Sequence, residues 1–192
     1  MTREPATLLI LAGGESTRMG FPKHRLRVAG RDILSHLHER LGHLFVETIV
    51  VGRDISIVPV GIRTVEDRYI ARGPLVGIHG GLHASRTDLA FVMGCDMPYV
   101  SAVLAGFLLA QAKGHDAAVP VVHGFYEPLG AAYRKACLEP IEWLIGSGLL
   151  KVSELYPLIN MREVGEEAIR QHDPSLRSFA NLNTERELEA AF

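Results

Sequence analysis

The stretch "LILAGGESTRMGFPK", Leu9 to Lys23, joins an apolar run to a loop that carries glycines, hydroxyl groups and basic residues. The apolar segment Thr7–Ala12 is typical of a strand that is buried on both faces inside a parallel sheet. Glycines directly after such a strand let the backbone approach a ligand closely, because they lack a Cβ atom. Arg18 and Lys23 add positive charge, so the stretch predicts a local site for an anion such as a phosphate.

The glycine loop departs from the two best-known phosphate-binding patterns. More residues separate Gly14 from Gly20 than the Walker motif allows, and no Lys-Ser or Lys-Thr pair follows. The loop also lacks the G-x-G-x-x-G arrangement. A tight strand-to-helix connection would use glycines too, so the glycines alone leave both interpretations open. The two cations nearby favour the anion site.

The first half of the chain alternates strand-like and helix-like segments. The further expected strands are Val46–Gly52, Asp88–Gly94 and His115–Val122, and the expected helices are 32–45, 74–86 and 101–114. Ser101 is placed as the N-cap of the last of these helices. This alternation, with short connections, predicts βαβ units and therefore an α/β fold: a single-domain, Rossmann-like, open, doubly wound and mostly parallel sheet.

The pattern loosens after Val122. The expected elements there are a hairpin or strand at 123–133, helices at 137–150 and 151–158, an edge strand at 161–167 and a terminal helix at 184–192. The chain has 192 residues and 47% hydrophobic content, which suits one compact core. We therefore expect a single domain over residues 1–192.

Composition excludes several classes of protein. Twenty Lys and Arg against twenty-two Asp and Glu leave a net charge of −2, so no bulk field draws the chain to nucleic acid or to an anionic membrane. Cys95 and Cys137 are too few for a disulfide framework. No apolar stretch approaches the ~18 residues of a membrane span, and the N-terminus lacks the pattern of a signal peptide. We expect a cytoplasmic protein without nucleic-acid or membrane partners.

Asp96 stands where the expected strand Asp88–Gly94 opens into a loop. Ligands of open α/β sheets bind at the carboxyl ends of the strands, so this loop, the glycine loop and the segment 66–77 should meet at one edge. A carboxylate there is a typical Mg²⁺ ligand near nucleotide phosphates. The alternative is an N-cap or Asx turn before Pro98. The adjacent anion site favours the metal.

Three other features are interpreted as structural. His79 and His83 have the spacing of a zinc pair, but the Glu of H-E-x-x-H and a third ligand are missing, so we expect no catalytic zinc. Cys95 is expected to pack as a small hydrophobe at the end of a buried strand, rather than to act as a reactive thiol. Trp143 is interpreted as a core residue or as a wall for a ligand.

Five motifs together resemble the molybdenum cofactor guanylyltransferases. The motifs are "LAGGESTRMGFPK", "GPLVGIHGGL", "CDMP", "EPLGAAY" and "FANLNTERELE", in the order and spacing of that family. The resemblance covers nearly the whole chain and implies the nucleotide-diphospho-sugar transferase type of fold. It implies a nucleotide-binding half at 1–122 and an acceptor-side half at 123–192. The implied reaction transfers GMP from GTP to the phosphate of molybdopterin and releases pyrophosphate, with Mg²⁺ as cofactor. Cofactor-handling proteins or apo-molybdoenzymes are implied as partners.

The resemblance assigns roles by position. It implies nucleotide contacts for Leu11, Ala12, Gly13, Gly14, Lys23, Asp67 and Asp96, the Mg²⁺ ligand at Asp96, and acceptor contacts for Asn181 and Asn183. With Asp96, the cations Arg18 and Lys23 make up the expected catalytic apparatus, because phosphoryl transfer needs charge stabilisation rather than a nucleophilic side chain. The asparagines could instead only fix a loop.

Two departures and two alternatives accompany the resemblance. Gly52-Arg53 stands where many members have Asn-Arg, and Pro22 replaces an acid that often precedes the lysine. Related chains that transfer cytidylyl groups tend to have Ala where this sequence has Gly13, so the sequence favours GTP over CTP. Cytidylyl transfer, or transfer to another small phosphate, remains the nearer alternative. A non-catalytic nucleotide-binding protein is the distant one, and Asp96 and Lys23 argue against it.

Overall fold

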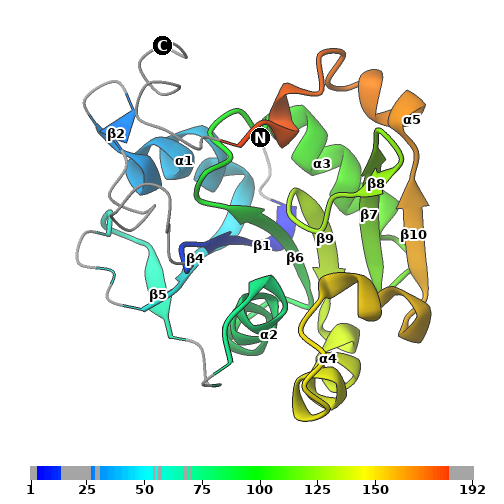
Figure 1. Ribbon diagram of the computed structural model, residues 1–192. Helices are drawn as coiled ribbons and strands as arrows, with labels where there is room; N and C mark the ends of the chain where they lie inside the picture. The colour runs from blue at the N-terminus through cyan, green and yellow to red at the C-terminus, as the bar shows by residue number, and fades with distance from the viewer. Residues whose placement is uncertain are drawn as a thin grey trace.

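The computed structural model describes residues 4–13, 27–28, 31–53, 55, 58–66, 69 and 71–181. These residues form an eight-stranded sheet flanked by helices (Figure 1). In spatial order the strands are β10 (Met161–Val164), β7 (Ala117–Val122), β9 (Ala131–Arg134), β6 (Leu89–Gly94), β1 (Glu4–Leu11), β4 (Phe45–Val51) and β5 (Arg63–Val65), and β8 (Phe125–Tyr126) pairs with β7.

The sheet is mostly parallel, as the sequence predicts. Strand β1 runs parallel to both β4 and β6, β5 continues the parallel run beside β4, and β10 is parallel to β7. Strand β9 enters between β6 and β7 and runs antiparallel to both, and β8 is antiparallel to β7. The four strands predicted in the first half are all present, as β1, β4, β6 and β7, and β5 was not predicted.

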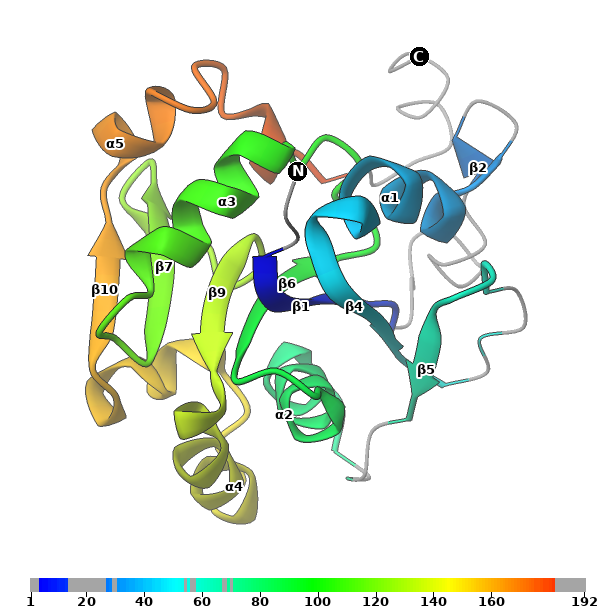
Figure 2. The same ribbon diagram turned by 180° about the vertical axis from the view of Figure 1, so that it is seen from behind.

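Helices cover both faces of the sheet. Helices α1 (Ile33–Leu41), α3 (Ala102–Gln111) and α5 (Glu166–Arg170) lie on one face, and α2 (Pro74–Ala84) and α4 (Leu138–Gly146) lie on the other (Figures 1 and 2). The strand β1 serves both layers, because Leu8 and Ile10 join the core under α1 and α3, whereas Leu9 and Leu11 join the core under α2 and α4. This is the doubly wound arrangement expected from the sequence.

Two glycines of helix α2 lie against side chains of β1. A Cβ atom at Gly81 would lie 2.7 Å from Leu9 Cδ1, and one at Gly77 would lie 3.3 Å from Leu11 Cδ1. The glycines of "GPLVGIHGGL" therefore let the helix axis approach the strand. The predicted cap of α3 is also present, since Ser101 Oγ accepts a hydrogen bond from the N–H of Leu104 at 3.0 Å.

The second half departs from the prediction in three places. The expected helix at 137–150 is shortened to α4, and Gly148 beyond it has a positive φ of 76°. The expected helix at 151–158 forms two 3₁₀ turns instead, because Pro157 has no N–H to continue an α-helix. The edge strand ends at Val164. Residues 184–192 lie outside the described part of the chain. No helix in the described part is both long and apolar enough to cross a membrane.

Candidate active site at the carboxyl edge of the sheet

Backbone hydrogen bonds tie the carboxyl ends of four neighbouring strands together. The N–H of Ala12 donates to Val51 O at 2.8 Å, the N–H of Cys95 donates to Leu11 O at 3.0 Å, and the N–H of Gly52 donates to Val65 O at 2.9 Å. The loops that leave β1, β4, β5 and β6 therefore start at one edge. The structure thus brings Gly13 and Asp96, two of the predicted site residues, out of adjacent strands.

Gly13 has free space where a side chain would project. Within the described part of the chain nothing lies within 4 Å of an ideal Cβ atom at this position, and its φ is not in the left-handed region. Neither packing against the described residues nor the backbone conformation therefore requires glycine here. Leu11 and Ala12, which precede it, are buried in the core. The predicted residues Gly14, Arg18, Lys23 and Asp67 lie outside the described residues.

Gly52 supports the backbone of Gly13 from the neighbouring strand end. A Cβ atom at Gly52 would lie 3.1 Å from Gly13 N and 3.2 Å from the carbonyl carbon of Ala12. A side chain at this position would require the two loops to separate slightly. The next residue, Arg53, donates from Nη2 to Tyr69 O at 2.7 Å, which links this loop to the segment before α2.

Asp96 is nearly buried, with 9% of its surface exposed, in the turn that follows β6. Its Oδ1 atom occupies the space that a Cβ atom at Gly94 would need, so a side chain at Gly94 would displace the carboxylate. The N–H of Met97 donates to Gly94 O at 3.2 Å and closes the turn. No cluster of three or more metal-ligating side chains occurs within the described ranges. The Asp96 carboxylate is an oxygen donor of the kind that Mg²⁺ prefers, and proteins often bind this ion through one or two carboxylates together with substrate phosphates.

The segment that carries Asn181 lies against the Asp96 turn. A Cβ atom at Gly130 would lie 3.2 Å from both Met97 Cε and Phe179 Cε1, so these two side chains meet over the start of β9. Asn181 follows Phe179 by two residues and is exposed. The structure thus brings Asn181 and Asp96 to the same region, while Asn183 lies outside the described residues.

Asp173 fixes this C-terminal segment. Its carboxylate accepts hydrogen bonds from the N–H of Ser178 at 2.8 Å and from the N–H of Arg177 at 3.3 Å. Burial opposes ionisation of Asp173, but these hydrogen bonds outweigh it, so its pKa lies below the usual value. Ser178 Oγ in turn accepts from the N–H of Ser101 at 3.3 Å, which attaches the segment to the start of α3.

Helix α2 begins at the same edge with Gly73 as its cap. Gly73 has a φ of 149°, which favours glycine, and within the described ranges no side chain caps the first turn. A Cβ atom at Gly73 would lie 3.8 Å from Leu150 O, so the start of α2 adjoins the segment that follows α4. The first N–H groups of an α-helix have no partner within the helix and favour negative charge.

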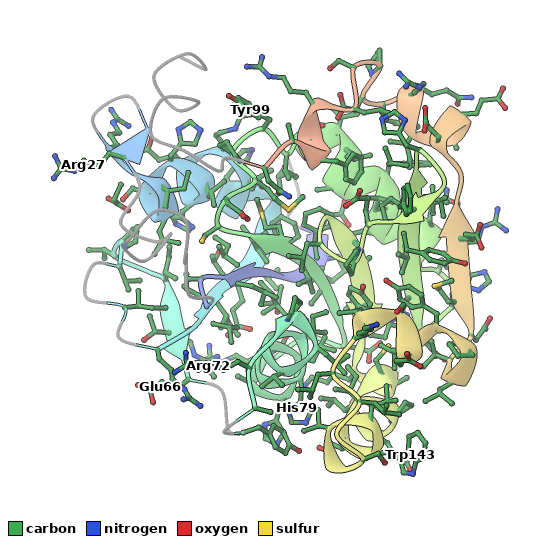
Figure 3. All side chains as sticks on the ribbon, viewed as in Figure 1. Arg27, Glu66, Arg72, His79, Tyr99 and Trp143 are labelled. Atoms are coloured by element: carbon green, nitrogen blue, oxygen red, sulfur yellow. The ribbon has the colours of Figure 1, made fainter. Side chains whose placement is uncertain are left out.

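His79, Cys95 and Trp143, which the sequence analysis did not assign to the reaction, differ in their surroundings. His79 is buried and pairs through Nε2 with Glu142 Oε1 at 2.9 Å, between α2 and α4 (Figure 3). Cys95 is buried in the core, as expected. The core assignment of Trp143 is wrong: Trp143 is 60% exposed and points outward (Figure 3). Helix α4 turns Ile141 and Leu144 inward, and Trp143 lies on the opposite face.

Glu127 is a polar residue near the site that the sequence prediction missed. It begins the segment "EPLG" between β8 and β9, and its side chain is half-buried. Burial raises the pKa of Glu127, although attraction from His123 partly opposes this effect. The sequence shows a carboxylate before a proline, which is common in exposed turns, so only the fold reveals that the carboxylate is partly desolvated.

Comparison with known proteins places the chain among nucleotidyltransferases. Residues 8–160 match the family described as the MobA-like NTP transferase domain. The chain is 35% identical to a probable molybdenum cofactor guanylyltransferase of Pelotomaculum thermopropionicum, over 97% of this chain and 91% of that protein. It is 32% identical to a molybdenum cofactor guanylyltransferase of Desulfosudis oleivorans, over 98% of this chain and 95% of that protein.

Solved structures agree with the fold. Molybdopterin-guanine dinucleotide biosynthesis protein A of Archaeoglobus fulgidus superposes with a TM-score of 0.83 at 26% identity and covers 96% of both chains. The 2-C-methyl-D-erythritol 4-phosphate cytidylyltransferase of Thermus thermophilus superposes with a TM-score of 0.72 at 20% identity, over 97% of this chain and 96% of that one. The second likeness concerns the fold alone.

Proposed function

Because the chain belongs to the MobA-like NTP transferase family, we propose that it is a molybdenum cofactor guanylyltransferase. It transfers GMP from GTP to the phosphate of molybdopterin and releases pyrophosphate. The observation that carries this proposal is the match, over nearly the full length of both chains, to relatives of that name. The shared edge that holds Gly13 and Asp96 supports it, because both motifs leave adjacent strands there.

The nucleotide binds along the end of β1 in this proposal. Leu11, Ala12 and Gly13 line the guanine and ribose, and the open space at Gly13 leaves room for the base to contact the backbone. Gly14, Lys23 and Asp67 add further nucleotide contacts, and Arg18 and Lys23 neutralise the phosphates. The main task is to bring two polyanions together in line, so no nucleophilic side chain is needed.

Asp96 is the proposed ligand of Mg²⁺. The ion, when bound, neutralises charge on the phosphates as pyrophosphate leaves. Gly94 keeps the Asp96 carboxylate against the strand end, and the Gly94–Met97 turn fixes its direction. Asn181 and Asn183 bind the acceptor in this proposal. The proposed setting is cytoplasmic, and cofactor-handling proteins or apo-molybdoenzymes receive the product.

Product analysis tests the function. The full-length chain is incubated with molybdopterin and with radiolabelled GTP, CTP or ATP in turn, with and without Mg²⁺. The proposal expects Mg²⁺-dependent label from GTP in the pterin product, together with one pyrophosphate per transfer. Label from CTP instead would indicate the cytidylyl alternative. Nucleotide binding without any transfer would indicate the non-catalytic alternative and would overturn the proposal.

A further inference from the structure

Glu127 is a half-buried carboxylate that the reaction described above does not use. Within the described part of the chain its carboxylate has no hydrogen bond and no ion pair, whereas Glu47, Glu142, Glu163 and Glu166 each have one. Partial burial of an anion without hydrogen-bond donors costs stability. A ligand that supplies N–H donors would remove that cost.

The hairpin that carries Glu127 is fixed by its backbone. His123 and Gly124 have positive φ values of 52° and 81°, which is typical of a two-residue turn of type I′. The N–H of His123 donates to Glu166 Oε2 at 2.7 Å. The N–H of Glu127 donates to Pro120 O at 2.9 Å. Because the backbone is held on both sides, the position of the carboxylate is set before any ligand arrives.

Aromatic rings surround this part of the hairpin. The rings of Tyr126 and Tyr156 lie 4.8 Å apart, and Tyr133 donates its hydroxyl to Pro128 O at 2.9 Å. Burial raises the pKa of Tyr156 to about 12, and the nearby negative charge of Glu127 contributes to this shift. The Glu127 carboxylate therefore lies in a part of the hairpin that is flanked by aromatic rings, which suits a flat heterocycle better than a free phosphate.

Glu127 also lies at a suitable distance from Asp96. The segment that it begins ends at Gly130, which adjoins Met97 next to Asp96, and Leu129 Cδ1 lies 3.5 Å from the Cβ position of Gly94. Glu127 precedes Gly130 by three residues, so the two Cα atoms are at most about 11 Å apart. A molecule with a phosphate at Asp96 could therefore reach Glu127 with its opposite end.

We propose that the Glu127 carboxylate recognises the pterin ring of the acceptor by accepting hydrogen bonds from its 2-amino group and its N3–H. These two donors lie side by side on the 2-amino-4-oxo-pyrimidine edge, and a carboxylate offers two oxygen atoms in a matching plane. The phosphate end of the same molecule then lies at the Asp96 turn. The inference rests on the proposed function, because it names the residue that binds the pterin end of the acceptor in that reaction.

The test uses the full-length chain and two probes without a phosphate. Pterin (2-amino-4-oxopteridine) has both donors, and lumazine (2,4-dioxopteridine) lacks the 2-amino group. Wild type should bind pterin more tightly than lumazine in a fluorescence titration. Glu127→Gln and Glu127→Ala should weaken pterin binding about 10- to 100-fold and remove the preference, the scale of a lost charge-assisted hydrogen bond. Glu139→Gln, an exposed glutamate on α4, is the matched control and should change neither value.

Steady-state kinetics separates this inference from the proposed function. In the Glu127 variants the KM for molybdopterin should rise about 10- to 100-fold while the KM for GTP stays within about twofold. A variant that keeps the wild-type preference for pterin and the wild-type acceptor KM would overturn the assignment of Glu127 alone. A raised KM for GTP would place Glu127 at the guanine and would also overturn it. Absence of transfer by the wild type would instead refute the proposed function. Urea unfolding of each variant identifies a loss of folding.

Discussion

Glu47, at the amino end of the central sheet, and Glu127, at its carboxyl end, differ in how their carboxylates are hydrogen-bonded. At the amino end, Thr7 Oγ1 lies 2.6 Å from Ser85 Oγ, 2.6 Å from Thr87 Oγ1 and 3.2 Å from Glu47 Oε2. These polar groups are hydrogen-bonded to one another within the protein. At the carboxyl end, Gly13 has free space beside it, and the carboxylate of Glu127 has no hydrogen bond within the described residues.

Glu47 completes the network at the amino end. It pairs with Arg63 and accepts a hydrogen bond from the N–H of Arg86 at 3.0 Å. Burial opposes its ionisation, but the donors of Arg86, Arg63 and Thr7 outweigh this effect and lower its pKa. Glu127 at the other end has its pKa raised by burial. The difference is the one expected if Glu47 contributes to stability and Glu127 binds a ligand, as proposed above.

The largest expected effect is at the carboxyl end. Asp96→Asn should reduce Mg²⁺-dependent transfer by a factor on the order of 10³ or more, because the proposed metal ligand is lost while the shape of the side chain is kept. The free energy of unfolding should stay within about 1 kcal/mol of wild type. Transfer rates with varied Mg²⁺ and urea unfolding measure the two quantities. Transfer at the wild-type rate would show that Asp96 does not bind the metal.

A substitution at the amino end should lower stability and leave substrate binding unchanged. Glu47→Ala should lower the free energy of unfolding by about 2–4 kcal/mol, because it leaves Arg63 and the N–H of Arg86 without their acceptor. The KM values for GTP and molybdopterin should not change. Urea unfolding together with steady-state kinetics tests this separation. A large change in either KM without loss of stability would contradict the contrast between the two ends.

Two glycine substitutions sharpen the same contrast. Gly81→Ala places a Cβ atom 2.7 Å from Leu9 Cδ1 and should cost about 1–2 kcal/mol of stability.

Gly13→Ala meets no described atom and should change stability by less than about 0.5 kcal/mol, yet it should reduce the preference for GTP over CTP. Thermal or urea unfolding and nucleotide competition measure both variants. Strong destabilisation by Gly13→Ala would mean that packing, rather than the nucleotide, requires this glycine.

The smallest expected effect is the pH dependence of the two glutamates. The lowered pKa of Glu47 stabilises the fold at neutral pH, and this contribution is lost as pH falls through the folded-state pKa. The raised pKa of Glu127 destabilises the ligand-free fold at neutral pH, and protonation removes this cost as pH falls. Glu127→Gln should therefore stabilise the ligand-free protein slightly at pH 7, and the gain should vanish as pH falls to the ordinary pKa of a glutamate. Glu47→Gln should show the opposite sign, and equal signs in urea unfolding at both pH values would contradict the comparison.

The sequence predicts local features of this molecule well and long-range features poorly. The apolar runs at Thr7–Ala12 and Asp88–Gly94 identify β1 and β6, because burial on both faces leaves no polar alternation. The insertion of β9 between β6 and β7 depends on pairing between distant segments, which no local pattern encodes. The core interpretation of Trp143 is wrong because aromatic character does not reveal which face of a helix is covered.

The candidate site also combines features that local sequence predicts with features that depend on long-range packing. Asp96 could be placed at a strand end from the sequence, because the strand pattern and the rule for open sheets suffice. The role of Gly94 under its carboxylate and the open space at Gly13 required the structure. Glu127 could not be singled out from "EPLG", since its partial burial results from packing of the hairpin against Tyr156 and its neighbours.

The most direct test of guanylyl transfer at the carboxyl edge is a competition between GTP and CTP for molybdopterin. One methyl group at Gly13 would discriminate by only ~1–3 kcal/mol, whereas a buried hydrogen-bonding group left unpaired by the wrong base discriminates far more strongly. We therefore predict that the wild-type kcat/KM for GTP exceeds that for CTP by at least about 10² when both labelled nucleotides compete in one reaction. Comparable incorporation of the two labels, or a preference for CTP, would contradict guanylyl transfer by this chain.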